Sequence, residues 1–175
     1  MKKFLLYVLI SWGLIALFPL WGHAQKNTTP TVKPINIRDA SDNPIPIPQL
    51  GKKHLLIFYV DPDHANQNTA FTDHLEKNHI LSDNIHSFGI VNLKDAPMLP
   101  NSIVRAMVRK KIKQTGADIY TDPDHLLRDG WNLGDVNNQF TLIFVTKDLE
   151  IKFLSKGELS QQQIDEFYRV IDEYK

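Results

Sequence analysis

A continuous apolar run over residues 54–60, His-Leu-Leu-Ile-Phe-Tyr-Val, constrains the fold more than any other segment of this chain. It is bounded by Gly51-Lys52 before it and by Asp61-Pro62-Asp63 after it. A strand that is apolar on both sides of its pleat is typical of a parallel sheet with helices on both faces. The run therefore predicts a buried central strand and, with it, an α/β fold.

After this strand, predicted helices and strands alternate. Asp61 as N-cap and Pro62 at the first helical position begin a helix that we expect to reach about His79. A strand over residues 85–92, a helix over 100–114, a strand over 117–121 and a short helix ending near Gly130 follow. In the helix over 100–114, the spacing predicts an inner face made of Ile103, Val104, Met107, Val108 and Ile112.

The two ends of the chain complete the sheet. Residues 140–145 and 149–154 form two strands joined by a tight hairpin, and Ser160 with Gln163 forms the capping box of a last helix. That helix carries on one side Ile164, Phe167, Val170, Ile171 and Tyr174. Near the N-terminus, residues 34–37 begin a strand, and the three prolines within 44–48 indicate an extended edge segment. We therefore predict a three-layer α/β sandwich, with a mixed sheet, an antiparallel C-terminal hairpin and a C-terminal helix.

Composition excludes several kinds of chemistry. The chain has 175 residues and no cysteine, which rules out thiolate nucleophiles, disulfides, cysteine zinc sites and iron–sulfur clusters. Its 20 basic and 20 acidic side chains give zero net charge, which argues against a nucleic-acid partner bound by bulk electrostatics. The length suits one domain.

The N-terminus predicts export. Lys2 and Lys3 precede an almost wholly apolar run over residues 4–20, and Gly22-His23-Ala24 places small residues where a signal peptidase cleaves. We predict a signal peptide over residues 1–24 cleaved after Ala24, a flexible leader over 25–33 and a single domain over 34–175. An uncleaved membrane anchor is the alternative. Cleavage predicts a periplasmic or secreted protein without stable membrane insertion.

The order of elements resembles that of thioredoxin-like proteins. Residues 119–128 resemble the strand, turn and helix inserted in peroxiredoxin-like and TlpA-like domains, and residues 140–154 resemble the hairpin that follows. Residues 90–96, Trp131-Asn132-Leu133 and residues 157–160 resemble, more closely, the YtfJ-like family of small periplasmic proteins. That resemblance covers roughly residues 50–175. It implies a thioredoxin-like fold, and the family has no established activity.

Both halves of the redox site of the thioredoxin-like oxidoreductases are missing. Where those proteins carry a catalytic cysteine after the first central strand, this chain has Asp61-Pro62-Asp63-His64. Where they carry a cis-proline before the hairpin, it has Asn137-Asn138-Gln139-Phe140. The chain is therefore neither a thiol–disulfide oxidoreductase nor a peroxidase, and nothing in the sequence indicates a cofactor.

The tetrapeptide Asp-Pro-Asp-His occurs twice, each time after a predicted strand. Ligands bind at the carboxyl ends of strands in α/β folds, and aspartate and histidine are ligands for divalent metals. The metal candidates are Asp61, Asp63, His64, Asp122, Asp124 and His125. The alternative is that each copy only begins a helix, with aspartate as N-cap and proline at the first position.

A binding surface is the leading functional hypothesis. Loops over residues 61–66, 92–98 and 134–140 form the face that holds the thiols in the redox proteins, so we expect an unidentified protein or small molecule to dock there. The candidates on this surface are Asp61, Asn92, Trp131, Asn138 and Gln139. Trp131 is either an exposed anchor or a cap over the core. The competing hypothesis is a divalent-metal-binding protein or metal-dependent enzyme that uses the paired turns.

A basic patch is a further candidate surface. Arg105 and Arg109, one turn apart, are expected on the solvent side of the helix over 100–114, among several lysines. They form either a patch for an anionic partner or an ordinary solvated face with cations near the helix C-terminus.

Overall fold

The computed structural model describes residues 31–78, 82–96 and 99–175. They form a seven-stranded mixed sheet with the strand order β2-β1-β5-β4-β3-β6-β7. The strands are β1 (Asn36–Arg38), β2 (Pro44–Pro46), β3 (His54–Val60), β4 (Ile85–Asn92), β5 (Ile119–Asp122), β6 (Phe140–Val145) and β7 (Ile151–Lys156). The apolar run of the sequence is thus the central strand, parallel to β4 and antiparallel to β6.

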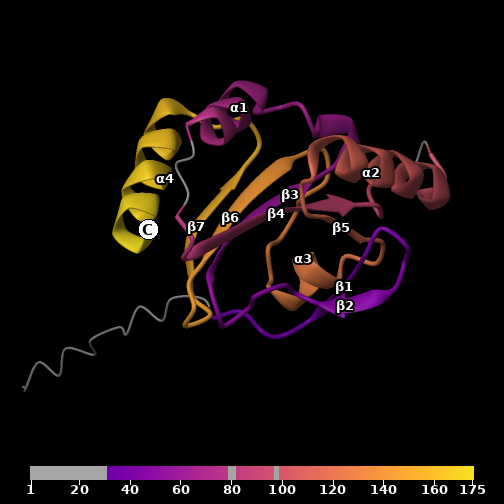
Figure 1. The fold of residues 1–175 in the computed structure, drawn as a ribbon, viewed down its shortest axis with the longest axis horizontal. Coiled ribbons are helices and arrows are strands. Elements are labelled where there is room, and N and C mark those ends of the chain that lie inside the picture. The colour runs from indigo at the N-terminus through magenta and orange to yellow at the C-terminus, as the bar shows by residue number, and fades with distance from the viewer. Residues whose placement is uncertain (1–30, 79–81, 97–98) are drawn as a thin grey trace, which may run out of the picture.

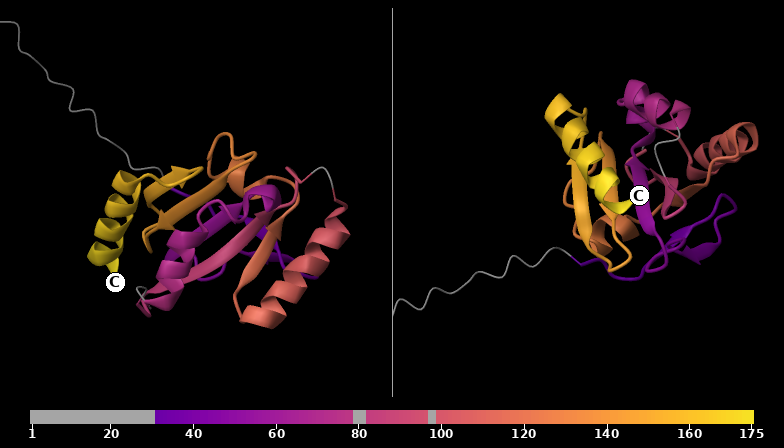
Figure 2. Two further views of the ribbon diagram at one scale, coloured as in Figure 1. Left: turned by 90° about the horizontal axis from the view of Figure 1, so that it is seen from above. Right: turned by 60° about the vertical axis from the view of Figure 1, so that its left-hand side comes forward.

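Helices cover the sheet on both faces, which confirms the predicted three-layer α/β architecture (Figure 1). Three helices lie on one face: α1 (Thr69–Lys77), α2 (Asn101–Thr115) and α4 (Gln161–Tyr174). The short helix α3 (Leu126–Gly130) and the β1–β2 hairpin lie on the other (Figure 2). The C-terminal hairpin is antiparallel, as predicted.

Two apolar clusters hold the layers together. Alternate residues of β3 point to opposite faces, so Leu55, Ile57 and Tyr59 pack under α3 and the β1–β2 hairpin, whereas Leu56 packs under α1 and α4. The predicted apolar side of α4 forms part of the second cluster, with Phe167, Val170 and Ile171 buried. Its capping box is also confirmed, because the Ser160 hydroxyl accepts from the Gln163 N–H and the Gln163 side chain accepts from the Ser160 N–H.

The helix expected after β3 is not continuous. A short 3-10 helix, η1 (Pro62–His64), begins at Asp61 as predicted, but α1 starts only at Thr69. The break is held by the side chain of Asn68, whose Nδ2 donates to the carbonyl of Gly157 and whose Oδ1 accepts from the N–H of Leu159. These long-range bonds fix the segment outside a helix. His79 lies outside the described residues.

The inner face of α2 is narrower than predicted. Val104 and Val108 are buried, but Ile103 and Met107 are exposed, so their assignment to the inner face is wrong. Arg105 lies on the opposite side of α2 from Ile103, and its largely covered guanidinium bonds to Asp42. The side of α2 that carries Arg105 therefore faces the β1–β2 loop, and the side that carries Ile103 faces away from it.

The hairpin strand β7 begins at Ile151, two residues later than predicted. Leu149 adopts a left-handed backbone conformation (φ 66°), and the N–H of Thr146 bonds to the carbonyl of Glu150. The connection is therefore longer than a three-residue turn.

The expected signal peptide over residues 1–24 and the leader as far as residue 30 lie outside the described residues. The first described residues pack against the core: Val32 is buried and its N–H bonds to the carbonyl of Leu149. None of the helices formed by residues 31–78, 82–96 and 99–175 is long and apolar enough to cross a membrane.

Candidate functional site

Three polar side chains lie in one row at the carboxyl ends of the parallel strands. Asn92 is paired with Asp122 across β4 and β5, and Asp61 follows Val60, the partner of Val91. All three polar side chains are buried, with exposures of 1% for Asp61 and 0% for the other two. Burying a polar group costs free energy unless it is hydrogen-bonded, so the hydrogen-bond partners of these side chains show how this end of the sheet is held together.

Asp61 ties together two loops that are far apart in sequence. Its Oδ1 accepts from the N–H of Asp63 (2.9 Å), which caps η1, and its Oδ2 accepts from the N–H of Asn138 (3.0 Å). The N–H of Asp61 itself donates to the carbonyl of Gln139 (3.2 Å). Hydrogen bonds to a carboxylate are stronger than those between neutral groups, so one side chain fixes both loops.

Asp122 organises the start of α3 from four residues away. Its Oδ1 accepts from the N–H of Leu126 (2.8 Å), and its Oδ2 accepts from the N–H of Leu127 (2.9 Å) and from the hydroxyl of Tyr59 (3.2 Å). Burial raises the pKa of Tyr59 far above its usual range, and the charge of Asp122 raises it further. Tyr59 therefore keeps its proton and donates a hydrogen bond to the Asp122 carboxylate, which also accepts from the N–H groups of Leu126 and Leu127.

A second pair lies beside this row. His125 Nε2 is 2.8 Å from Asp95 Oδ2, and the Asn92 side chain donates to the same oxygen (2.5 Å). His125 is buried and has a left-handed backbone (φ 58°), a conformation that residues other than glycine adopt at a cost in free energy. The pair joins the loop after β4 to the N-terminus of α3.

The two Asp-Pro-Asp-His turns do not share a site. They follow β3 and β5, which are separated by β4, so about 10 Å of sheet lies between them. Asp63 and Asp124 are exposed, and His64 is half-buried at the end of η1. Within the described residues, no group of three or more histidine or carboxylate side chains is arranged to hold a metal ion.

The two turns also differ in conformation. In the first, Asp61 is the N-cap and Pro62 the first helical residue, as predicted. In the second, the helix begins at Leu126 with His125 as its N-cap residue, so the predicted helix start at Asp122 and Pro123 is wrong. The Asp122 carboxylate accepts from the N–H groups of Leu126 and Leu127, so it bonds to the first turn of α3 from outside the helix.

The five binding-surface candidates separate into buried and exposed groups. Asp61 and Asn92 are buried, as described above, and Trp131 packs in the core and donates from Nε1 to the carbonyl of Lys33 (2.8 Å). The structure thus places Trp131 as a cap over the core. Asn138 is exposed and Gln139 is half-buried, so these two residues reach solvent at the loop before β6.

Sequence reasoning missed Tyr59 and Asp95. Tyr59 is the only hydroxyl within the apolar run of β3, and Asp95 follows Asn92 at a spacing that lets their side chains meet across the turn after a strand. Both signals were present in the sequence, but only the pairing of β3, β4 and β5 shows that Tyr59 meets Asp122 and that Asp95 lies beside the same row.

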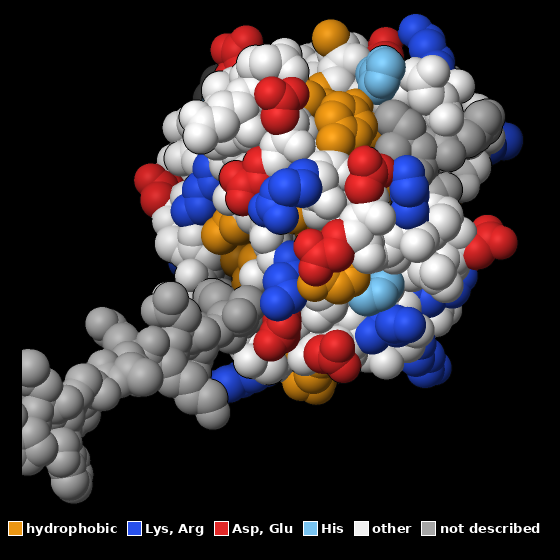
Figure 3. All heavy atoms as spheres, turned by 90° about the vertical axis from the view of Figure 1, so that its left-hand side faces the viewer, with side chains coloured by type: hydrophobic (Ala, Val, Ile, Leu, Met, Phe, Trp, Pro, Cys, Tyr) orange, Lys and Arg blue, Asp and Glu red, His pale blue; other side chains and the backbone are white. Residues whose placement is uncertain are grey.

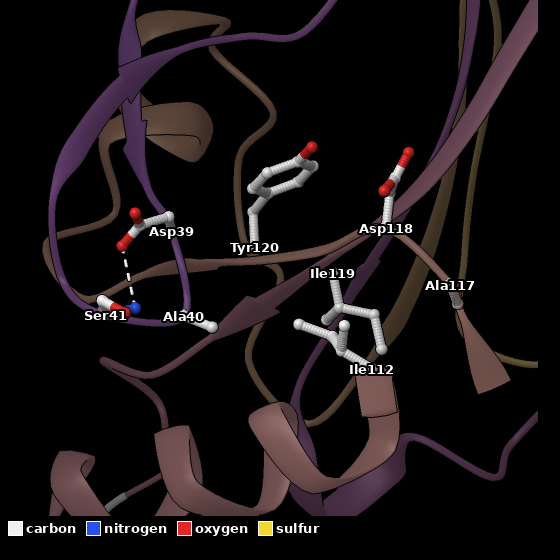
Figure 4. A pocket seen from close by; sticks show the side chains of 8 residues that line it. All are labelled: Asp39, Ala40, Ser41, Ile112, Ala117, Asp118, Ile119 and Tyr120. Carbon is white, nitrogen blue, oxygen red and sulfur yellow. Dashed lines mark hydrogen bonds between the residues drawn. The ribbon is translucent and has the colours of Figure 1, made fainter. Parts of the chain in front are cut away.

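A shallow cleft of about 240 Å³ lies away from this row, between the β1–β2 loop, the end of α2 and the start of β5 (Figure 4). Ile112 and Ile119 point toward each other within it, whereas the carboxylate of Asp118 and the ring of Tyr120 point to the other side of β5. Asp39, at its rim, accepts from the N–H of Ser41 (2.8 Å). The cleft lies at the opposite end of β5 from Asp122 and is separate from the candidate site.

Comparison with solved structures settles the fold. A DsbF homologue from Corynebacterium diphtheriae superposes with a TM-score of 0.61 at 15% identity, covering 85% of this chain and 88% of that one. The exposed lipoprotein thioredoxin Etrx1 of Streptococcus pneumoniae gives 0.58 at 11% identity, covering 79% and 99%. The fold is thioredoxin-like. A putative thioredoxin from Neisseria meningitidis agrees, with a TM-score of 0.58 at 17% identity over 83% and 90% of the chains.

Sequence comparison adds no family to this result. No family model matches the chain, and no curated protein matches it. The thioredoxin-like fold without any cysteine fits a protein that lacks thiol redox activity.

Proposed function

We propose that this chain is an exported thioredoxin-like protein of the cell envelope, of the YtfJ-like type, that binds a partner without thiol chemistry. The N-terminal signal pattern of the sequence supports export. The likeness to an exposed lipoprotein thioredoxin supports an envelope location. The partner is a periplasmic protein or small molecule.

The observation that carries this proposal is the carboxylate of Asp61. In the redox members of the fold, the loop after the central strand and the loop before the hairpin hold the reacting thiols and the cis-proline. Here the same two loops are bonded to each other through Asp61, at 2.9 Å to Asp63 and 3.0 Å to Asn138. Loops that are already fixed lose little conformational freedom when a partner binds, which favours a docking role.

The docking surface is made of the exposed side chains of these two loops: Asp63, Ala65, Asn66, Asn137 and Asn138. Behind them, Asp61 supports the backbone of both loops from inside the molecule. A surface of amide and carboxylate groups on fixed backbone suits a polar partner that reads hydrogen bonds.

The test is a pulldown in which every thiol of the extract is blocked. Envelope partners are recovered with the wild-type protein, with a loop variant carrying Asp63→Arg and Asn137→Arg, and with the control Gln162→Arg on the exposed side of α4. We expect the loop variant to lose the partners that the control retains. If all three proteins recover the same partners in the same amounts, the loops are not the docking surface and the proposal fails.

A further inference from the structure

The outer side of α2 exposes a row of large apolar side chains. Of the five large hydrophobic residues that are well exposed in the described chain, three belong to this region: Leu99 (44%), Ile103 (47%) and Met107 (58%). Ile103 and Met107 are one turn apart in α2, and Leu99 comes just before the helix. Single exposed apolar residues are ordinary, but a row of them marks an interaction surface.

The same helix is strongly basic. Its 15 residues include five arginines and lysines and no aspartate or glutamate. Two of the cations are used internally: Arg105 bonds to Asp42 (2.6 Å), and Arg109 donates to the carbonyl of Ala40 (2.8 Å). The remaining three are exposed, and none of them has an ion pair within the described residues: Lys110, Lys111 and Lys113.

One of the free lysines shares the side of the helix that carries the apolar row, and the other two flank it. At 100° per residue, Ile103, Met107 and Lys110 fall within an arc of about 60°. Arg105 and Arg109 mark another side, which contacts the β1–β2 loop. In Figures 1 and 2, α2 lies at the margin of the molecule, and no other element covers its outer side.

The face of the molecule seen in Figure 3 does not repeat this pattern. On the face that includes the side of α4, acidic and basic side chains alternate without a large patch of one sign (Figure 3). The whole chain has zero net charge, so the positive charge of α2 is a local feature. This local positive charge therefore indicates a negatively charged partner.

We propose that the outer face of α2, defined as Leu99, Ile103, Met107, Lys110, Lys111 and Lys113, binds the surface of a bilayer that contains anionic phospholipid. A helix with an apolar row beside lysines lies in the headgroup plane, with the row in the acyl boundary and the cations at the phosphates. A nucleic acid would use the lysines but not the apolar row. This surface is independent of the docking surface.

Vesicle co-sedimentation tests the proposal. The chain from Gln25 onward is used, because both core clusters and every described element lie within it. We expect it to bind vesicles of phosphatidylcholine with phosphatidylglycerol, to bind vesicles of phosphatidylcholine alone far less, and to dissociate as salt is raised.

Two variants separate the contributions. Changing Lys110, Lys111 and Lys113 to Gln should weaken binding at least about tenfold, because each cation near an anionic surface contributes about fivefold. Ile103→Ser with Met107→Ser should weaken it by about tenfold through the loss of buried apolar area. The matched control changes three lysines elsewhere to Gln: Lys33, Lys52 and Lys53.

Four results would overturn the proposal. Equal binding to both kinds of vesicle would remove the role of anionic lipid, and equal weakening by the lysine control would make the attraction nonspecific. Wild-type binding by the Ile103 and Met107 variant would show adsorption by charge alone. Self-association in gel filtration that the same variant abolishes would assign the row to a second copy of the chain.

Discussion

At the scale of single residues, two buried aspartates hold loops and a helix start in place. Asp61 holds two loops and Asp122 holds the start of α3, each through backbone N–H groups at 2.8–3.0 Å. Both residues begin an Asp-Pro-Asp-His tetrapeptide, yet the backbone that follows differs. The tetrapeptide is the same in the two copies, but its first aspartate has different distant partners: Asn138 for Asp61, and Tyr59 for Asp122.

Asp61→Asn tests the anchor role directly. The amide keeps one acceptor but loses the charge and one of the two backbone bonds, so we expect the free energy of unfolding to fall by about 2 kcal/mol in urea titrations. The exposed Asp63 provides the control, because Asp63→Asn should change the free energy of unfolding by less than about 0.5 kcal/mol. An Asp61→Asn protein more stable than wild type would mean that the carboxylate is held for a ligand at the expense of stability.

At the scale of elements, the sequence pattern predicted the strands and helices that depend on residues close together in the chain. The central strand, the edge segment with its prolines and the capping box of α4 all follow from composition and spacing, and the structure contains them. The break before α1 could not be predicted, because it depends on bonds from Asn68 to residues 157 and 159. The roles of the buried row Asp61, Asn92 and Asp122 could not be predicted either, because a sequence does not show which strands are neighbours.

The edge strand β2 gives a prediction of its own. The N–H of Ile47 bonds toward β1, so the alternate positions Pro44 and Pro46 face the free edge, where proline has no N–H to offer. Changing both prolines to Thr restores two donors there. We expect the variant to self-associate with rising concentration in light scattering when the wild-type protein does not.

Pro48→Thr, just outside β2, is the matched control for this experiment. If the double variant behaves like the wild type at every concentration, the edge is protected by something other than the missing donors.

At the scale of the whole molecule, stability is divided between two apolar clusters on either side of one sheet. No disulfide joins the layers, since the chain has no cysteine. His54, at the start of β3, is buried in the helical layer beside the rings of Phe144 and Tyr174. Its Nδ1 accepts from the N–H of Lys147 (3.3 Å), which requires that nitrogen to be unprotonated.

This histidine makes stability depend on pH. Burial lowers the pKa of His54, and the charge of Lys147 lowers it further. The unfolded chain therefore binds a proton on His54 more readily than the folded one, so stability is lost as pH falls below about 6.5. We expect His54→Gln to reduce the loss of unfolding free energy between about pH 7.5 and about pH 5.

The exposed His74 is the control for this prediction, and His74→Gln should leave the pH dependence as it is. If His54→Gln shows the same loss as the wild type, other groups are responsible for the acid sensitivity.

The position of β3 between β4 and β6 has a consequence for how the chain is made. One edge of β3 can pair as soon as β4 exists, but the other waits for residues 140–145, near the end of the chain. Until those residues emerge from the ribosome or a translocation channel, the apolar central strand β3 has an open edge, which is a template for aggregation. Truncated chains that stop before Phe140 are therefore expected to depend on a chaperone, whereas the complete chain closes that edge itself.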